Sequence, residues 1–240
     1  MVLVNNRRTK NIFSIIFKQS LVGLLMFLIG ISIIFYAHGY KFNFKNFKII
    51  KTGIIYVSSE QREANLYVNG VLVAPKLPFA YGCLPGFYNL EIKKDGYQSW
   101  KSRIQVTAEK VSSFDYIVLF KNNISKEQTS DAGVINQLIS PNDELFRSNN
   151  TIYYNDYEIW EGQNLVARFS KPINRAIWFS DNYHIIYQQG DEIRVIEKTG
   201  TNDTFLIRLE NNAITNFDIS SNGNELYFKD LGRYYKAVIK

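Results

Sequence analysis

The feature that most constrains this chain is an uncharged apolar run near its N-terminus. From Gln19 to Ala37 the sequence has no Asp, Glu, Lys or Arg, and a helix there would have no solvated stripe. At about 1.5 Å per residue, these 19 residues would cover about 28 Å, close to the thickness of a bilayer hydrocarbon core. The sequence therefore predicts a transmembrane helix over 19–38. Residues 1–18 are predicted as a cytoplasmic basic tail, of which residues 11–18 continue the same helix.

The distribution of charge agrees with a membrane location. Residues 1–51 carry eight Lys or Arg and no acid, residues 52–139 carry nine bases and eight acids, and residues 140–240 carry eleven bases and fourteen acids. The net charge of +6 therefore arises around the apolar run. A nucleic-acid-binding domain would place its excess of bases on the folded part, so we expect no nucleic acid partner.

The orientation of the span is decided by weaker arguments. Four Lys or Arg precede the run and four follow it up to Lys51, so the positive-inside rule is neutral. The short N-terminal tail and the long, strand-rich remainder favour a single-pass protein with its N-terminus inside and its C-terminal domains extracytoplasmic. A cleaved signal peptide stays open as an alternative, because Ala37-His38-Gly39 has a small-x-small pattern.

Residues 39–51 are predicted as a basic, aromatic juxtamembrane stem. Lysines at a helix end can extend to the headgroups, and tyrosines favour the membrane interface. Phe44 and Phe47 interleave with the lysines of this stretch. Each lysine contributes about 1 kcal/mol of binding free energy near an anionic lipid surface. A simple solvated stem is the alternative. The candidate interface residues are Lys18, Tyr36, Tyr40, Lys41, Phe42 and Lys45.

Short strands with turn signals follow over residues 52–121. The run 53–59 is β-rich, and 64–68 leads through Asn69-Gly70, a strong hairpin signal, into 71–73. Further strands are expected at 87–93, 100–106 and 114–120, with a turn at Asp95-Gly96. About six strands without helical periodicity predict a small β-sandwich.

Several of these stretches resemble the PEGA domain, a small β-sandwich module of bacterial and archaeal surface proteins. The most specific part runs from Leu84-Pro85-Gly86-Phe87-Tyr88 to Lys94-Asp95-Gly96-Tyr97 and Trp100. This resemblance implies a bacterial surface location and brings no catalytic motif with it.

A polar linker is predicted over 122–134, and a repeat occupies residues 135–240. Ser140, Ser180 and Ser220 recur forty residues apart, each after an apolar residue and before a polar turn and a strand. The pattern resembles the WD40-like repeats of TolB-type propellers, which implies two to three blade-like antiparallel sheets. These are too few for a closed propeller. The sheets could stack compactly with the PEGA-like unit over one face, pair with another copy in a homo-oligomer, or remain marginally stable; we favour the first.

Motifs for enzymatic chemistry are few. The sequence has one cysteine, Cys83, and two distant histidines, His38 and His184, and it contains no phosphate-binding loop or nucleophile elbow. We therefore expect no cofactor and no metal. A wall-acting hydrolase remains as an alternative, with carboxylates drawn from Asp143, Glu144, Asp181, Asp191 and Glu192.

These observations predict a mostly β protein with an N-terminal transmembrane helix and no enzymatic activity. It would contact the bilayer through residues 19–38 and bind an unidentified envelope protein or a surface glycan. A purely structural membrane-tethered subunit is a further alternative. The candidate binding residues are aromatics expected on the rims of the blade-like sheets: Tyr153, Tyr157, Trp160 and Trp178.

Overall fold

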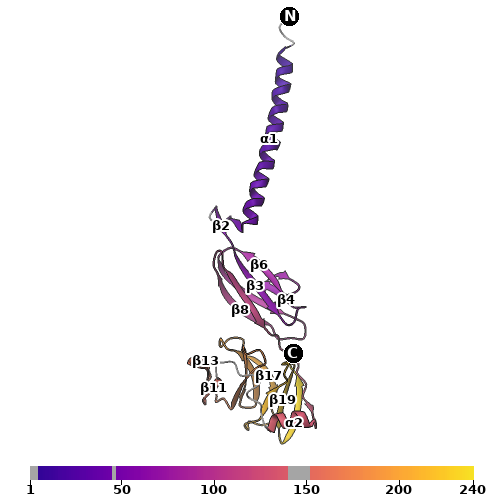
Figure 1. The fold of residues 1–240 in the computed structure, drawn as a ribbon, viewed down its shortest axis with the longest axis vertical. Coiled ribbons are helices and arrows are strands. Elements are labelled where there is room, and N and C mark those ends of the chain that lie inside the picture. The colour runs from indigo at the N-terminus through magenta and orange to yellow at the C-terminus, as the bar shows by residue number, and fades with distance from the viewer. Residues whose placement is uncertain (1–4, 45–46, 140–151) are drawn as a thin grey trace. The chain divides into compact units, whose positions relative to one another are not determined.

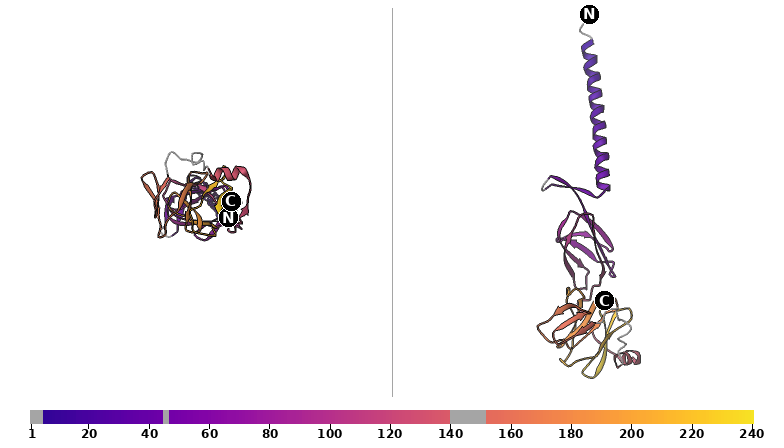
Figure 2. Two further views of the ribbon diagram at one scale, coloured as in Figure 1. Left: turned by 90° about the horizontal axis from the view of Figure 1, so that it is seen from below. Right: turned by 60° about the vertical axis from the view of Figure 1, so that its left-hand side comes forward.

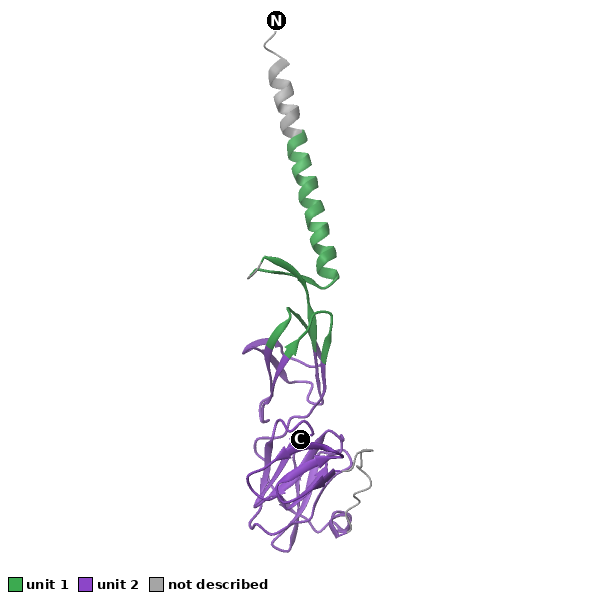
Figure 3. Ribbon diagram, turned by 90° about the vertical axis from the view of Figure 1, so that its left-hand side faces the viewer, with its two compact units in different colours: residues 1–55, 80–87, 105–112 green, residues 56–79, 88–104, 113–240 purple. Residues whose placement is uncertain are grey.

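The computed structural model describes residues 5–44, 47–139 and 152–240. The chain is mostly β, with one long N-terminal helix and several small antiparallel sheets. It divides into two compact units, which are described separately (Figure 3). The first comprises residues 1–55, 80–87 and 105–112, and the second comprises residues 56–79, 88–104 and 113–240.

The first unit begins with the uninterrupted helix α1 (Asn5–Ala37), which unites the predicted basic tail and the apolar run (Figure 1). Within α1, Ile16–Ala37 is long and apolar enough to cross a membrane, and none of it is buried. The helix ends at Ala37 and is followed by Gly39, whose φ of 75° favours glycine at this position. Thr52 then donates to the Gly39 carbonyl through its backbone nitrogen and its hydroxyl, at 2.8 and 2.9 Å.

A two-stranded hairpin follows the helix, made of β1 (Tyr40–Asn43) and β2 (Lys48–Lys51). The strands are antiparallel, and Phe42 pairs with Ile49. The predicted stem therefore has regular structure, which alternating aromatic and basic residues favour in a two-stranded ribbon.

Residues 53–117 form two antiparallel sheets, ordered β6-β3-β9 and β5-β4-β7-β8. Burial alternates along most of these strands, so each sheet has one apolar face. Asn69 and Gly70 form the expected tight turn, with φ of 50° and 80°. The strands are β3 (Gly53–Ser59), β4 (Asn65–Val68), β5 (Val71–Ala74), β6 (Phe79–Cys83), β7 (Gly86–Lys93), β8 (Trp100–Val106) and β9 (Val111–Ile117).

Strand β6 lies between the expected strands 71–73 and 87–93, in a stretch where Pro78, Gly82 and Pro85 are typical of a loop and the sequence predicted no strand. The predicted linker also contains regular structure. Strand β10 (Glu127–Gln128) pairs with the last strand of the chain, and helix α2 (Ala132–Ile139) buries Val134 and Leu138. The Asp131 carboxylate caps α2 by accepting from the Gly133 backbone nitrogen at 2.7 Å.

Three small antiparallel sheets complete the second unit, ordered β11-β12-β13, β14-β15-β16-β17 and β10-β20-β19-β18. Their strands are β11 (Ile152–Tyr154), β12 (Glu158–Glu161), β13 (Asn164–Arg168), β14 (Arg175–Trp178), β15 (His184–Gln189), β16 (Glu192–Glu197), β17 (Thr204–Arg208), β18 (Phe217–Ile219), β19 (Glu225–Asp230) and β20 (Arg233–Val238).

The middle sheet is covered on both faces. Ile185 and Tyr187 of β15 pack in one core with Ile159 of β12, whereas Ile186 packs in a second core with Phe217 and Phe228. Burial on both faces explains why His184–Tyr187 is a continuous buried run without polar alternation. The sheets thus stack through two cores. Residues 152–240 contain no closed propeller, and the propeller-type repeats stay a prediction.

Candidate functional site

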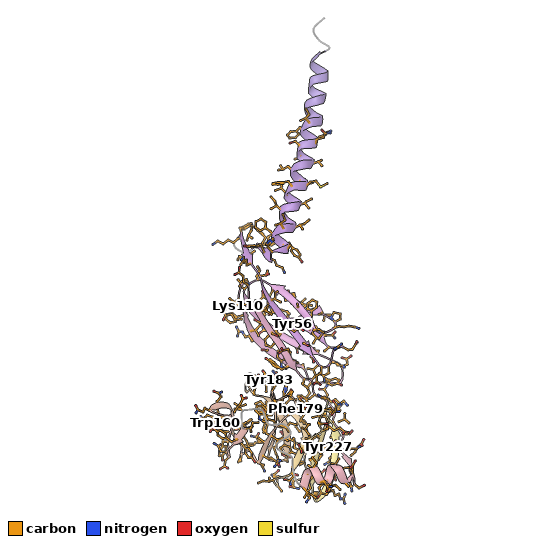
Figure 4. All side chains as sticks on the ribbon, viewed as in Figure 1. Tyr56, Lys110, Trp160, Phe179, Tyr183 and Tyr227 are labelled. Carbon is orange, nitrogen blue, oxygen red and sulfur yellow. The ribbon has the colours of Figure 1, made fainter. Side chains whose placement is uncertain are left out.

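The apolar part of α1 is the first candidate surface, because its side chains are not buried (Figure 4). Large residues from Leu21 to Phe35 are about half exposed or more along most of the helix. The 22 residues of Ile16–Ala37 cover about 33 Å at about 1.5 Å per residue, which matches a bilayer core. This helix is consistent with a single membrane span or a signal sequence.

The predicted interface residues lie at and beyond the two ends of this apolar stretch. Lys18 and Tyr36 are exposed. The Tyr40 ring contacts Phe35 edge-on, with ring centroids 5.5 Å apart. Lys41 is exposed, and its ammonium donates to the Gly82 carbonyl at 2.7 Å. Phe42 is 45% exposed, and Lys45 lies outside the described residues.

A second candidate surface is an aromatic row across the sheet β11-β12-β13. Tyr153 pairs with Trp160, and Trp160 pairs with Leu165, so the three side chains share one face. The Tyr153 and Trp160 rings are nearly parallel, with an angle of 4° and centroids 6.2 Å apart. Tyr153 and Leu165 are 48% and 43% exposed. The row is a flat apolar strip flanked by polar groups, among them Glu158, which accepts from Trp160 Nε1 at 3.0 Å.

The four predicted binding aromatics do not form a single group. Tyr157 is exposed in the turn between β11 and β12, beside the row. Trp178 was expected on an exposed rim, and this expectation is wrong, because its side chain is buried with Ile185 and Tyr187 in one of the two cores. Its partner in the sheet, Ile185, is also buried, so this position of β14 faces inward.

Sequence reasoning missed Leu165 as a member of the row. The signal was present in the turn at Gly162, which brings β13 back beside β12 and so fixes which residue lies opposite Trp160.

A buried carboxylate in the second unit accepts several hydrogen bonds from side chains. Glu197 is 2% exposed, and it accepts from Trp100 Nε1 at 2.5 Å, Thr201 Oγ1 at 2.8 Å and Asn202 Nδ2 at 2.9 Å. A cavity of about 20 Å³ lies beside Trp100 and Glu197, enough for about one water molecule. Trp100 and Glu197 are 97 residues apart in sequence, so this hydrogen bond connects two distant strands, β8 and β16. We assign the cluster a structural role.

Two side-chain pairs lie next to that cluster, one of two tyrosines and one of a histidine and an aspartate. Tyr116 stacks on Tyr183 with ring centroids 3.6 Å apart, and burial raises the pKa of the Tyr183 phenol well above its ordinary value. His184 Nδ1 lies 2.6 Å from Asp181 Oδ2. Burial raises the pKa of Asp181, but the hydrogen bond and charge of His184 outweigh it and keep this pKa below its ordinary value. The buried His184 is therefore a packed residue.

The carboxylates considered for a hydrolase have individual structural partners. Asp181 pairs with His184, Asp191 with Arg208, and Glu192 with both Arg194 and Arg208. Asp143 and Glu144 lie outside the described residues. Among the residues that the structure describes, no group of three or more His, Cys, Asp or Glu side chains could hold a metal ion.

Comparison with known protein families gives a match over residues 52–119. This segment is a PEGA domain. The match includes all seven strands β3 to β9, so the resemblance seen in the sequence is confirmed for this part of the chain. The PEGA domain occupies less than half of the chain. No curated protein matches the chain.

Proposed function

We propose that this chain is a non-enzymatic, single-pass cell-envelope protein, whose α1 helix holds it in the bilayer and whose β domains bind a partner outside the cytoplasm. The observation that carries the proposal is the combination of an unburied apolar helix with a PEGA domain in one chain. Anchoring confines the β domains to two dimensions, which raises their effective concentration at the membrane.

The aromatic row of Tyr153, Trp160 and Leu165 is the proposed contact surface for that partner. A flat strip of parallel rings fits the apolar face of a sugar or of a protein side chain, and the flanking Glu158 and Arg168 supply polar contacts at its edge. The partner is a surface glycan or an envelope protein. A propeller-type ancestry of the sheets is part of this proposal, supported by the forty-residue spacing of Ser140, Ser180 and Ser220.

Topology is tested by protease digestion of cells that express the full chain. The proposal expects the β domains to be cleaved in intact cells and the full-length chain to remain in the membrane fraction after carbonate washing. Cleavage only after permeabilisation would overturn the orientation. Release of a chain shortened by the apolar run would show a signal sequence in place of an anchor.

Partner binding is tested by titrating the detergent-solubilised chain with cell-wall glycan fragments and measuring the heat of binding by calorimetry. Trp160→Ala is expected to abolish the response. Ile214→Ala removes another exposed apolar side chain, 72% exposed and outside the row, and is expected to leave the response unchanged. No response to glycans, combined with crosslinking of Tyr153→Cys to an envelope protein, would identify a protein partner; equal behaviour of the two variants would overturn the row as the binding surface.

A further inference from the structure

The hairpin β1–β2 has two chemically different faces. Because paired residues of an antiparallel ribbon share a face, Tyr40 lies with Lys51, and Phe42 lies with Ile49. The opposite face pairs Lys41 with Ile50 and Asn43 with Lys48. One face is thus mainly aromatic and aliphatic, and the other is mainly basic and polar.

The aromatic face is exposed, and it continues into the tip of the hairpin. Phe44 and Phe47 are each 79% exposed, Ile49 is 55% exposed and Phe42 is 45% exposed. The rings gather around Phe42, whose centroid lies 4.9 Å from that of Phe44 and 6.1 Å from that of Phe47. A cluster of four large apolar side chains is costly in water and marks an interaction surface.

Contacts within the first unit show which way each face is turned. On the aromatic face, the Tyr40 ring packs against Phe35 of α1. On the basic face, Lys41 Nζ reaches the Gly82 carbonyl of β6. The aromatic face thus meets the end of α1 through Tyr40, and the basic face meets β6 through Lys41. Lys51, beside Tyr40, pairs with Glu109, so the free part of the aromatic face is the part around Phe42 and Ile49. The hairpin leaves the end of α1 sideways in Figure 1 and in the right-hand view of Figure 2.

The charge of this region suits an anionic membrane surface. Residues 1–51 contain no acidic residue. In the hairpin, the ammonium of Lys51 pairs with Glu109, while Lys48 is exposed on the basic face. Cations flanking exposed aromatic rings are typical of a segment that lies in the headgroup region, with its rings at the boundary with the acyl chains.

We propose that the hairpin 40–51 is a second membrane contact, which inserts Phe42, Phe44, Phe47 and Ile49 into the interfacial layer where α1 leaves the bilayer. This inference rests on the proposed function, because it takes α1 as the membrane span. A single membrane-spanning helix can rotate freely about its own axis. A hairpin that is attached to the end of the helix and embedded in the interfacial layer restrains this rotation. The hairpin thus sets the direction in which the chain leaves the membrane after α1.

The test uses the full chain with Cys83→Ala, carrying one environment-sensitive fluorophore on a single introduced cysteine. The variants are Phe44→Cys at the hairpin tip, Leu25→Cys inside α1, and Val71→Cys on the exposed β5. Each is reconstituted into vesicles of phosphatidylcholine and phosphatidylglycerol, with and without brominated acyl chains. The proposal expects bromolipid quenching at Phe44→Cys and Leu25→Cys, and quenching by aqueous iodide at Val71→Cys alone.

Each other result has a defined meaning. Quenching of Leu25→Cys by bromolipid, with Phe44→Cys behaving like Val71→Cys, overturns the hairpin proposal and leaves the membrane anchor intact. A Leu25→Cys label that is insensitive to bromolipid overturns the anchor itself. If the label at Phe44→Cys is shielded from both quenchers, and unlabelled Phe44→Cys forms disulfide-linked dimers under oxidising conditions, the tip docks on a second copy and the lipid proposal is wrong.

A second measurement addresses the aromatic cluster directly. Ser replaces Phe44 and Phe47 together while the label is moved to Asn43→Cys, and the matched control replaces Val71 and Leu72 of β5 in the same way. The proposal expects bromolipid quenching of the Asn43→Cys label to fall with the phenylalanine pair and to stay unchanged with the control pair. Equal quenching in both backgrounds would overturn the role of the rings.

Discussion

Two apolar runs in this chain have opposite environments. Leu21–Phe35 in α1 has no protein cover, whereas His184–Tyr187 in β15 is buried on both faces by neighbouring sheets. Neither run has a solvated polar face, so the absence of polar alternation alone does not separate them. Their lengths and flanks do, because a long helical run flanked by lysines needs lipid, while a four-residue run between polar turns is satisfied by two protein layers.

The largest effect is expected when the removal of a buried phenylalanine is compared with the removal of an exposed one. Phe228→Ala removes a fully buried ring from the core below β15 and is expected to lower the free energy of unfolding by about 3–5 kcal/mol. Phe44→Ala removes an exposed ring and is expected to change it by less than about 0.5 kcal/mol. Urea unfolding of the detergent-solubilised chain measures both, and similar losses would contradict the comparison.

A charge placed in the uncovered run tests its need for lipid. Leu25→Arg is expected to disfavour membrane insertion by about 2.5–3.5 kcal/mol, because arginine is costly near the centre of a spanning helix. The measurement is the fraction of chain retained by membranes after carbonate washing. Leu231→Arg, at a position 66% exposed in the turn before β20, serves as the control and should leave retention unchanged. Full retention of Leu25→Arg would contradict a membrane-spanning α1.

Glu197→Gln tests a polar group at the end of the buried run in β15, because Glu197 of β16 pairs with His184 in the sheet. The carboxylate accepts from Trp100, Thr201 and Asn202, and hydrogen bonds to a charged group contribute about 1.5–3 kcal/mol. An amide would also place a donor opposite existing donors. We expect a loss of about 2 kcal/mol in urea unfolding. Glu210→Gln, in an exposed ion pair with Lys126, should lower the free energy of unfolding by less. A larger loss in Glu210→Gln than in Glu197→Gln would contradict the structural role of the Glu197 cluster.

The smallest effect is expected in the dependence of stability on pH. The pKa of Asp181 is lower in the folded chain than its ordinary value, so the folded state favours the ionised carboxylate. Its contribution is therefore complete above the ordinary aspartate pKa of about 4 and is lost as the pH falls through the folded value. Unfolding free energies measured at decreasing pH should fall less steeply in Asp181→Asn than in the unaltered chain. Identical slopes would contradict the pairing with His184.

Local signals in the sequence predicted most of the fold. The absence of charge from Gln19 to Ala37 was sufficient for α1, and Asn69-Gly70 was sufficient for the β4–β5 turn, because each depends only on neighbouring residues. Strand β6 and helix α2 were missed because prolines, glycines and polar residues in these short stretches are typical of loops as well.

The candidate sites depended on information that a sequence does not carry directly. Trp160 and Trp178 lie in similar strands, yet one is partly exposed and the other is buried, because the register of each strand decides which face it presents. The partners of Glu197 could not be predicted, since Trp100 reaches it only through the packing of distant segments.

The entry and exit of the C-terminal region are neighbours. Lys121 donates its backbone nitrogen to the Ile239 carbonyl at 2.9 Å, and Lys240 pairs with Glu60 at 2.6 Å. Strand β10 also pairs with β20, the last strand of the chain. Fraying of β20 would therefore release β10 and the hydrogen bond of Lys121 at the same time, so these segments open together as one local unit.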